Sequence, residues 1–169
     1  MEDIFPGPDR VDRIQLQWAA ERPDVDVTPQ ALIGRLHRLA AALTAELTPV
    51  FDRHGLGEGE FDVLAALRRS GAPFELAPGE LASHTMVTSG AATKRIDRLV
   101  ADGLVERRVG EKDARTRIVA LTERGRRVID EAFADHMENE ARLVGLLGEA
   151  DRQALEPILR RWLAAAGAD

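Results

Sequence analysis

Hydroxyl and cationic side chains gather at the start of one predicted helix, in the segment 88–95 of the chain. The hydroxyl groups of Thr88, Ser89 and Thr93 can donate hydrogen bonds to phosphates or to base edges. Lys94 adds a positive charge, and the small Gly90 lets the helix end approach a groove floor closely. A helix N-terminus also offers free N–H groups and a positive dipole end to phosphate. These residues predict binding to nucleic acid.

A second cationic group follows in residues 110–116, which form the polar tip between two predicted strands. Arg115 and Arg117 stand at this tip or just after it, and an arginine there can enter the narrow minor groove of A·T-rich DNA. Asp113 can pair with an arginine and shape the loop. A polar β-turn with incidental charges is the alternative interpretation.

The elements that must position these residues are a helix at 78–84, a tight turn, a helix at 89–102 and a two-stranded hairpin at 104–109 and 117–121. This order is typical of a winged helix-turn-helix, in which the second helix enters the major groove. Apolar residues at helical spacing predict further helices at about 9–22, from 28 to the break at Gly55, 58–70, 122–147 and 149–163. The fold class predicted is therefore mainly α with a small β-hairpin wing.

The charge of the chain is unevenly distributed, although its net value of −6 argues at first against a nucleic-acid partner. Residues 84–127 hold eleven Lys or Arg against six Asp or Glu, a local balance of +5. An acidic body with a basic reading segment disfavours non-specific contact with phosphates elsewhere on the surface.

Composition excludes several other classes of protein. The chain has no cysteine, which removes disulfides, thiol redox sensing and cysteine-based zinc sites. We find no Ser/His/Asp set, no glycine-rich phosphate loop and no metal-spaced cluster, and the four histidines are scattered. The sequence therefore predicts a protein that is not an enzyme and uses no cofactor or metal. No apolar run is long enough for a membrane span and no secretory signal is visible, so a cytoplasmic location is expected.

The outer helices predict a homodimer. Long apolar faces on helices that flank a small reading module are most easily buried against a second copy, and one recognition helix alone reads too few bases. We expect an N-terminal extension helix in 1–27, dimerisation helices in 28–56 and 122–169, and the winged helix-turn-helix in 57–121, all within one intertwined domain.

With these residues in place, the chain resembles the MarR family of bacterial transcription regulators. The resemblance covers nearly everything from residue 28 to 163 and is carried by the segments 93–99 (TKRIDRL), 103–105 (GLV), 113–115 (DAR) and 121–125 (LTERG). It implies an obligate homodimer, a recognition helix at 89–102, Arg115 in the minor groove, and binding to palindromic operators. It also implies a repressor that a small ligand releases.

A finer resemblance is to the urate-responsive subgroup of that family, which has an added N-terminal helix. The matching residues, which the resemblance implies line or gate a ligand site, are Trp18, Asp62, Arg69, Arg95 and Arg107. An aromatic anion such as urate or a phenolic acid suits the planar fork of arginine, and Trp18 can stack on it. The alternative is structural: Asp62 and Arg69 form salt bridges, and Trp18 packs the first helix.

The sequence thus predicts a ligand-responsive transcriptional regulator that binds duplex DNA as a homodimer. The DNA-contacting residues expected are Thr88, Ser89, Gly90, Thr93, Lys94, Arg98, Arg115 and Arg117. The alternative function is a winged-helix module for protein interaction or dimerisation that does not bind DNA. The cationic residues at both predicted contact points argue against that alternative.

Overall fold

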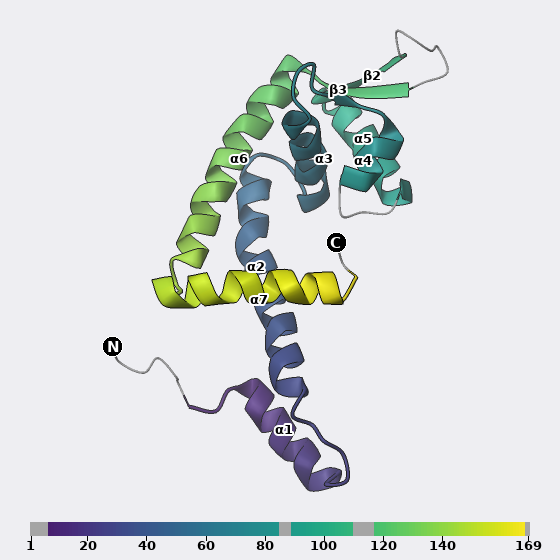
Figure 1. The fold of residues 1–169 in the computed structure, drawn as a ribbon. Helices are drawn as coiled ribbons and strands as arrows, with labels where there is room; N and C mark the ends of the chain where they lie inside the picture. The colour runs from purple at the N-terminus through teal and green to yellow at the C-terminus, as the bar shows by residue number, and fades with distance from the viewer. Residues whose placement is uncertain (1–6, 85–88, 110–116, 168–169) are drawn as a thin grey trace. The chain divides into compact units, whose positions relative to one another are not determined.

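The computed structural model describes residues 7–84, 89–109 and 117–167, and side chains outside the segment 82–92 (Figure 1). In these ranges the elements are α1 (Arg10–Glu21), α2 (Gln30–Arg53), α3 (Glu58–Arg69), β1 (Glu75–Leu76), α4 (Pro78–His84), α5 (Ser89–Ala101), β2 (Val105–Val109), β3 (Arg117–Leu121), α6 (Glu123–Val144) and α7 (Glu149–Ala165). The predicted fold class, mainly helical with a small antiparallel wing, is confirmed. None of the described helices is both long and apolar enough to cross a membrane.

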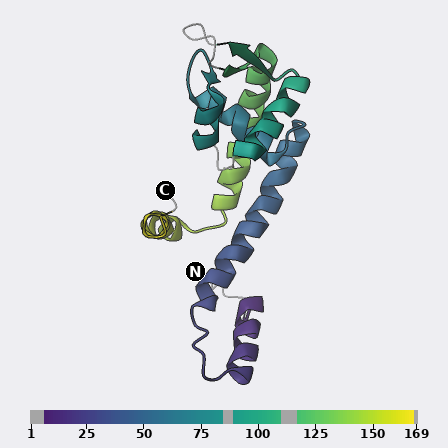
Figure 2. The same ribbon diagram turned by 90° about the vertical axis from the view of Figure 1, so that its right-hand side faces the viewer.

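The chain forms two compact units, residues 1–46 and 47–169, and each is described by itself. In the first unit, α1 lies beside the first part of α2 (Figure 2). Asp9 begins α1 with a capping box: its carboxylate accepts from the backbone N–H groups of Val11 and Asp12, and Asp12 accepts from the N–H of Asp9. Such a box satisfies backbone donors that a helix start leaves open.

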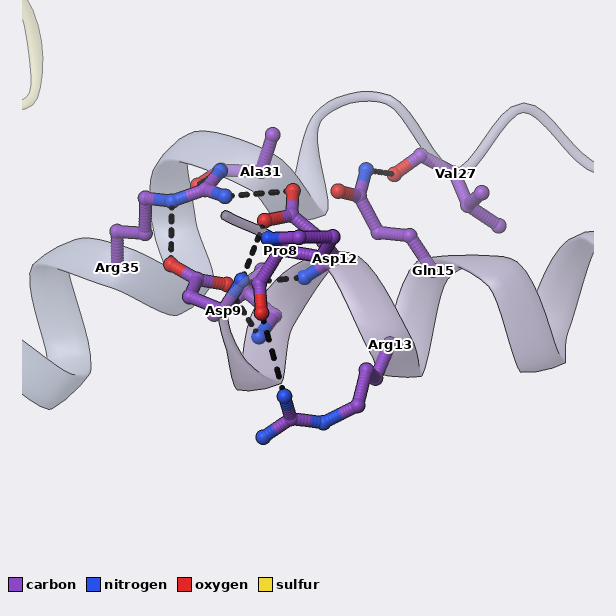
Figure 3. A network of polar contacts seen from close by, with 9 residues as sticks. Pro8, Asp9, Asp12, Arg13, Gln15, Val27, Ala31 and Arg35 are labelled. Carbon is purple, nitrogen blue, oxygen red and sulfur yellow. Dashed lines mark hydrogen bonds and ion pairs between the residues drawn. The ribbon is translucent and has the colours of Figure 1, made fainter. Parts of the chain in front are cut away.

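Arg35 of α2 fastens α1 in place (Figure 3). Its Nε donates to Asp9 at 2.9 Å and its Nη2 to Asp12 at 2.6 Å, so one guanidinium bridges both acids of the cap. The N–H of Asp12 and the guanidinium of Arg35 hold the pKa of Asp9 below its usual value. Gln15 adds a bond from its side-chain amide to the carbonyl of Val27. The extension helix is therefore an ordered part of this unit.

The core of the second unit is built around α3. Val63, Leu64 and Leu67 are fully buried, and α3 contacts α5, α6 and the sheet. Leu99 of α5 and Ile129 of α6 close the same cluster. Within α3, Leu67 follows Val63 and Leu64 by four and three residues, and this spacing gives the helix the apolar face that the sequence predicts.

The sheet has three antiparallel strands in the order β1-β3-β2. The predicted hairpin is present: Val105 pairs with Leu121, and Val109 pairs with Arg117. A third strand, β1, was absent from the sequence prediction, because two residues are too few to show an alternating pattern. It pairs Glu75 with Ala120. β3 is therefore the central strand.

Thr122 joins the hairpin to α6. Its Oγ1 accepts from the N–H of Gly125 at 3.0 Å and donates to the carbonyl of Gly103 at 2.8 Å. The residue thus acts as the predicted N-cap of α6 and also ties the helix to the turn before β2.

Candidate nucleic-acid interface

The helix α5 follows α4 in a helix-turn-helix arrangement, and the two helices contact each other (Figure 1). Ile96 and Leu99 are buried on the inner face of α5, while Thr93 and Lys94 are exposed. The inner residues therefore fix which side of α5 points outward. This places a hydroxyl and an ammonium group where a duplex can reach them.

The opening of α5 lies where the sequence predicts it. The helix begins at Ser89 with Gly90 next, although the structure does not describe their side chains. Thr88, the predicted cap, lies outside the described residues. The assignment of these three residues to DNA contact stays a prediction.

Two arginines of α5 reach back toward α3. Arg98, which is exposed, has its Nη1 3.6 Å from the carboxylate of Glu60. Arg95 is partly buried, and its guanidinium lies against the backbone of Gly59. Sequence reasoning assigned Arg98 to DNA and Arg95 to a ligand, and it missed Gly59 and Glu60 as their neighbours. The alternation of glycine and glutamate in 57–60 is the signal that was available.

The wing is held against α5 by an ion pair. Arg107 of β2 donates from its Nη2 to the carboxylate of Asp97 at 2.6 Å. Arg107 thus contacts α5, and its assignment to the predicted ligand set stays a prediction. Arg117, exposed at the start of β3, stands at the base of the hairpin tip. Asp113 and Arg115 lie outside the described residues.

Three of the predicted ligand residues are electrostatically coupled. Burial, together with the neighbouring carboxylate of Glu58, raises the pKa of Asp62 above its usual value of 3.8. The charges of Arg95 and Arg69 act on Asp62 in the opposite direction, with a further contribution from His136. Asp62 on α3 is therefore influenced by the charges of both Arg69 and Arg95.

Two pockets lie beside members of the predicted ligand set. Arg69 and Arg68 line one of about 310 Å³ between α3 and α6, with Ala65, Ile129, Asp130 and Phe133 as the other walls. Trp18, half exposed, lines a separate pocket of about 560 Å³ within the first unit, where Val25, Val27 and Ile33 are its apolar neighbours. The role of Trp18 as a ligand residue or a packing residue stays a prediction.

Comparisons with known proteins agree with this geometry. The MarR family sequence profile matches residues 54–116. The HTH-type transcriptional regulator PecS of Dickeya dadantii (strain 3937) is 36% identical over 151 residues, which cover 89% of this chain and 91% of PecS. Among solved structures, the MarR family regulator Sco5413 of Streptomyces coelicolor superposes with a TM-score of 0.71 at 26% identity, over 85% of this chain and 98% of that one.

A further structural neighbour is BpsR of Bordetella bronchiseptica, with a TM-score of 0.68 at 24% identity over 78% of this chain and 91% of its own. At that identity the likeness concerns the fold alone. The relatives are transcriptional regulators and not enzymes, in agreement with the sequence prediction. This chain is a DNA-binding, winged-helix protein of transcription regulation, and it belongs to the MarR family.

Proposed function

We propose that the chain is a repressor that binds a palindromic operator as a homodimer and is released by a small aromatic anion. The observation that carries the DNA-binding part is the outward position of Thr93 and Lys94 on α5, beside a hairpin that Arg107 fastens to Asp97. Two copies of this winged helix-turn-helix, related by a two-fold axis, can read two half-sites that lie one turn of the DNA helix apart. Such a protein acts in the cytoplasm.

Uncovered apolar faces support the homodimer. In the described part of α7 no residue is buried, although Leu155, Ile158, Leu159 and Leu163 recur at helical spacing. In the first unit Leu32, Leu39 and Leu43 of α2 are likewise exposed. Burying one leucine or isoleucine fully is worth roughly 1.5–3 kcal/mol. A second copy of the chain supplies apolar surface of the same kind.

The ligand class follows from the charges around α3. Asp62, Arg69 and Arg95 interact electrostatically, and Arg69 opens into the pocket beside Phe133. Arginine binds planar carboxylates and enolates through its fork, and phenylalanine offers an apolar wall. BpsR, whose DNA binding is regulated by 6-hydroxynicotinic acid, is a structural neighbour with an effector of this chemistry. Urate and phenolic acids are therefore the effectors proposed.

Selection from a library of random duplexes tests the DNA-binding part. The wild-type protein should enrich a two-fold symmetric motif and bind it with two protomers per duplex. A transcription assay on a promoter carrying that motif should show less transcript when protein is added. Failure to enrich any duplex would favour the interaction module without DNA binding, and enrichment of an asymmetric site by a monomer would contradict the dimer.

Calorimetric titration with urate and with salicylate tests the effector part. Binding should weaken at least about fivefold in Arg69→Ala, since one charged hydrogen bond is lost. Arg142→Ala, an exposed arginine near the end of α6, is the matched control and should bind as the wild type does. Equal affinity of Arg69→Ala and wild type would remove the α3 cluster from effector binding.

A further inference from the structure

We infer that Gly59 of α3 is a positioning residue for the helix α5. The guanidinium of Arg95 lies directly against the backbone at Gly59, where there is no side chain. The inference rests on the proposed role of α5 in reading DNA. It concerns a residue of α3 that has no side chain with which to touch DNA or ligand.

A side chain at position 59 would push the guanidinium of Arg95 out of its present position. A Cβ atom built on Gly59 would overlap the guanidinium of Arg95, at its Cζ, Nε and Nη2 atoms. The Nη1 atom of Arg95 is buried and has no hydrogen-bond partner among the described residues. The Cζ, Nε and Nη2 atoms of the guanidinium therefore lie directly against the backbone of α3 at Gly59.

A second glycine provides room for the neighbouring contact. A Cβ on Gly57 would overlap the carboxylate of Glu60, which is the group that faces Arg98 at 3.6 Å. Glu60 is largely buried, with 12% of its side chain exposed. The segment 57–60, which we call the α3 seat, thus receives two arginines that stand one turn apart on α5.

The charge of α3 favours the same arrangement. Glu58 and Asp62 lie one turn apart on α3, and Arg95 acts on Asp62 across the helix contact. An attractive field brings the guanidinium toward α3, and the glycine backbone lets it lie flat there. The glycine backbone and the negative charge of α3 therefore both act on the side chain of Arg95.

Two contacts spaced one turn apart fix the rotation of a helix about its own axis. Ile96 and Leu99 hold α5 in the core, and they tolerate small rotations because apolar packing has no direction. Arg95 and Arg98 border that apolar stripe and touch a defined point on α3. The seat therefore sets the angle at which Thr93 and Lys94 face the duplex.

A double-mutant cycle tests the inference on the full-length protein. Affinity for the duplex enriched by wild type is measured by fluorescence anisotropy for Gly59→Ala, Arg95→Ala and the double variant. Gly59→Ala should bind at least about fivefold more weakly, as should Arg95→Ala. The double variant should bind no more weakly than Arg95→Ala alone, because Gly59 acts through Arg95. Effects that multiply, or wild-type affinity of Gly59→Ala, would overturn the inference.

Salt dependence separates positioning from direct DNA contact. If Arg95 itself touched a phosphate, its removal would lower the slope of log affinity against log salt by about 0.9. The inference expects an unchanged slope in both Gly59→Ala and Arg95→Ala. A reduced slope in Arg95→Ala would overturn it.

Stability is measured alongside, so that unfolding is not mistaken for mispositioning. Gly79→Ala is the control for a general glycine effect in helices, because a Cβ there meets nothing within 4 Å. The melting temperature of Gly59→Ala should lie within a few degrees of the melting temperature of Gly79→Ala. If Gly59→Ala does not fold, the variant Arg95→Lys tests the inference instead. Lysine keeps the positive charge but has no planar group to lie flat against Gly59, so Arg95→Lys should bind the duplex as weakly as Arg95→Ala does. Wild-type affinity of Arg95→Lys would overturn the inference. Lys94→Ala serves as the reading control, since its wild-type affinity would refute the proposed role of α5 separately.

Discussion

The guanidinium of Arg107 in β2 lies 2.6 Å from the carboxylate of Asp97 in α5. Both side chains are about half exposed, and the pair joins the wing to the recognition helix. Exposed pairs of this kind contribute about 0–1 kcal/mol to stability. Their effect on function is expected to be larger, because they fix the angle between two elements that must meet adjacent grooves.

Arg107→Gln should therefore weaken operator binding about five- to tenfold while lowering the melting temperature only slightly. Asp97→Asn should do the same, and the double variant should be no worse than either single one. Anisotropy and thermal unfolding on the same samples check this. If the losses of DNA affinity in the two single variants multiplied in the double variant, the two residues would contribute to DNA binding independently of each other.

Arg35→Ala should loosen α1 within the first unit, since Arg35 bridges Asp9 and Asp12. Backbone amides of α1 should exchange with deuterium about tenfold faster, as expected when a cap and its partner are lost together. Arg38→Ala, an exposed arginine three residues later, is the control. Unchanged exchange in Arg35→Ala would mean that apolar contacts such as those of Val11 suffice to hold α1.

Asp62→Asn should raise the melting temperature at pH 7, and the gain should vanish in acid. Burial and the carboxylate of Glu58 raise the pKa of Asp62 above 3.8, so the folded state binds this proton more readily than the unfolded state does. The wild type is therefore penalised increasingly as the pH rises from about 3.8 through the raised pKa. Thermal unfolding of both proteins from pH 3.5 to 8 measures the difference.

Asp52→Asn, an exposed aspartate on α2, is the control for a general charge effect. A gain of Asp62→Asn that is constant over the whole pH range would argue against titration of this carboxyl as the cause.

Ile158→Glu with Leu163→Glu should shift the chain from dimer to monomer. Both side chains are about half exposed in the single chain, so charging them costs the protomer little. Loss of their burial against a second copy should weaken the dimer on the order of 100-fold or more. Sedimentation velocity measures the change, and Arg160→Glu is the matched control. A dimer that persists would place the interface elsewhere.

Helix positions can be predicted from this sequence because their boundaries are chemically marked. Asp9 and Thr122 act as the N-caps they were predicted to be, and the breaks near Gly55 and Gly103 fall where the described helices α2 and α5 have ended. These signals are local, so no knowledge of tertiary structure is needed.

The contacts between elements cannot be predicted in the same way. Gly59 reads as an ordinary helix residue until α5 is seen to lay Arg95 against it. Arg107 matches a ligand pattern in sequence, yet its partner Asp97 lies ten residues earlier on another element. Such partners depend on the packing angle of α3, α5 and the sheet, which one sequence does not contain.

The most direct test of the account is the salt-dependent affinity of Lys94→Ala for the enriched duplex. We expect the variant to lose about 1–3 kcal/mol of binding free energy and about 0.9 of the salt slope, with the dimer intact. Arg142→Ala, far along α6 in the sequence, should bind as wild type. Wild-type affinity and slope in Lys94→Ala would contradict the claim that α5 reads DNA.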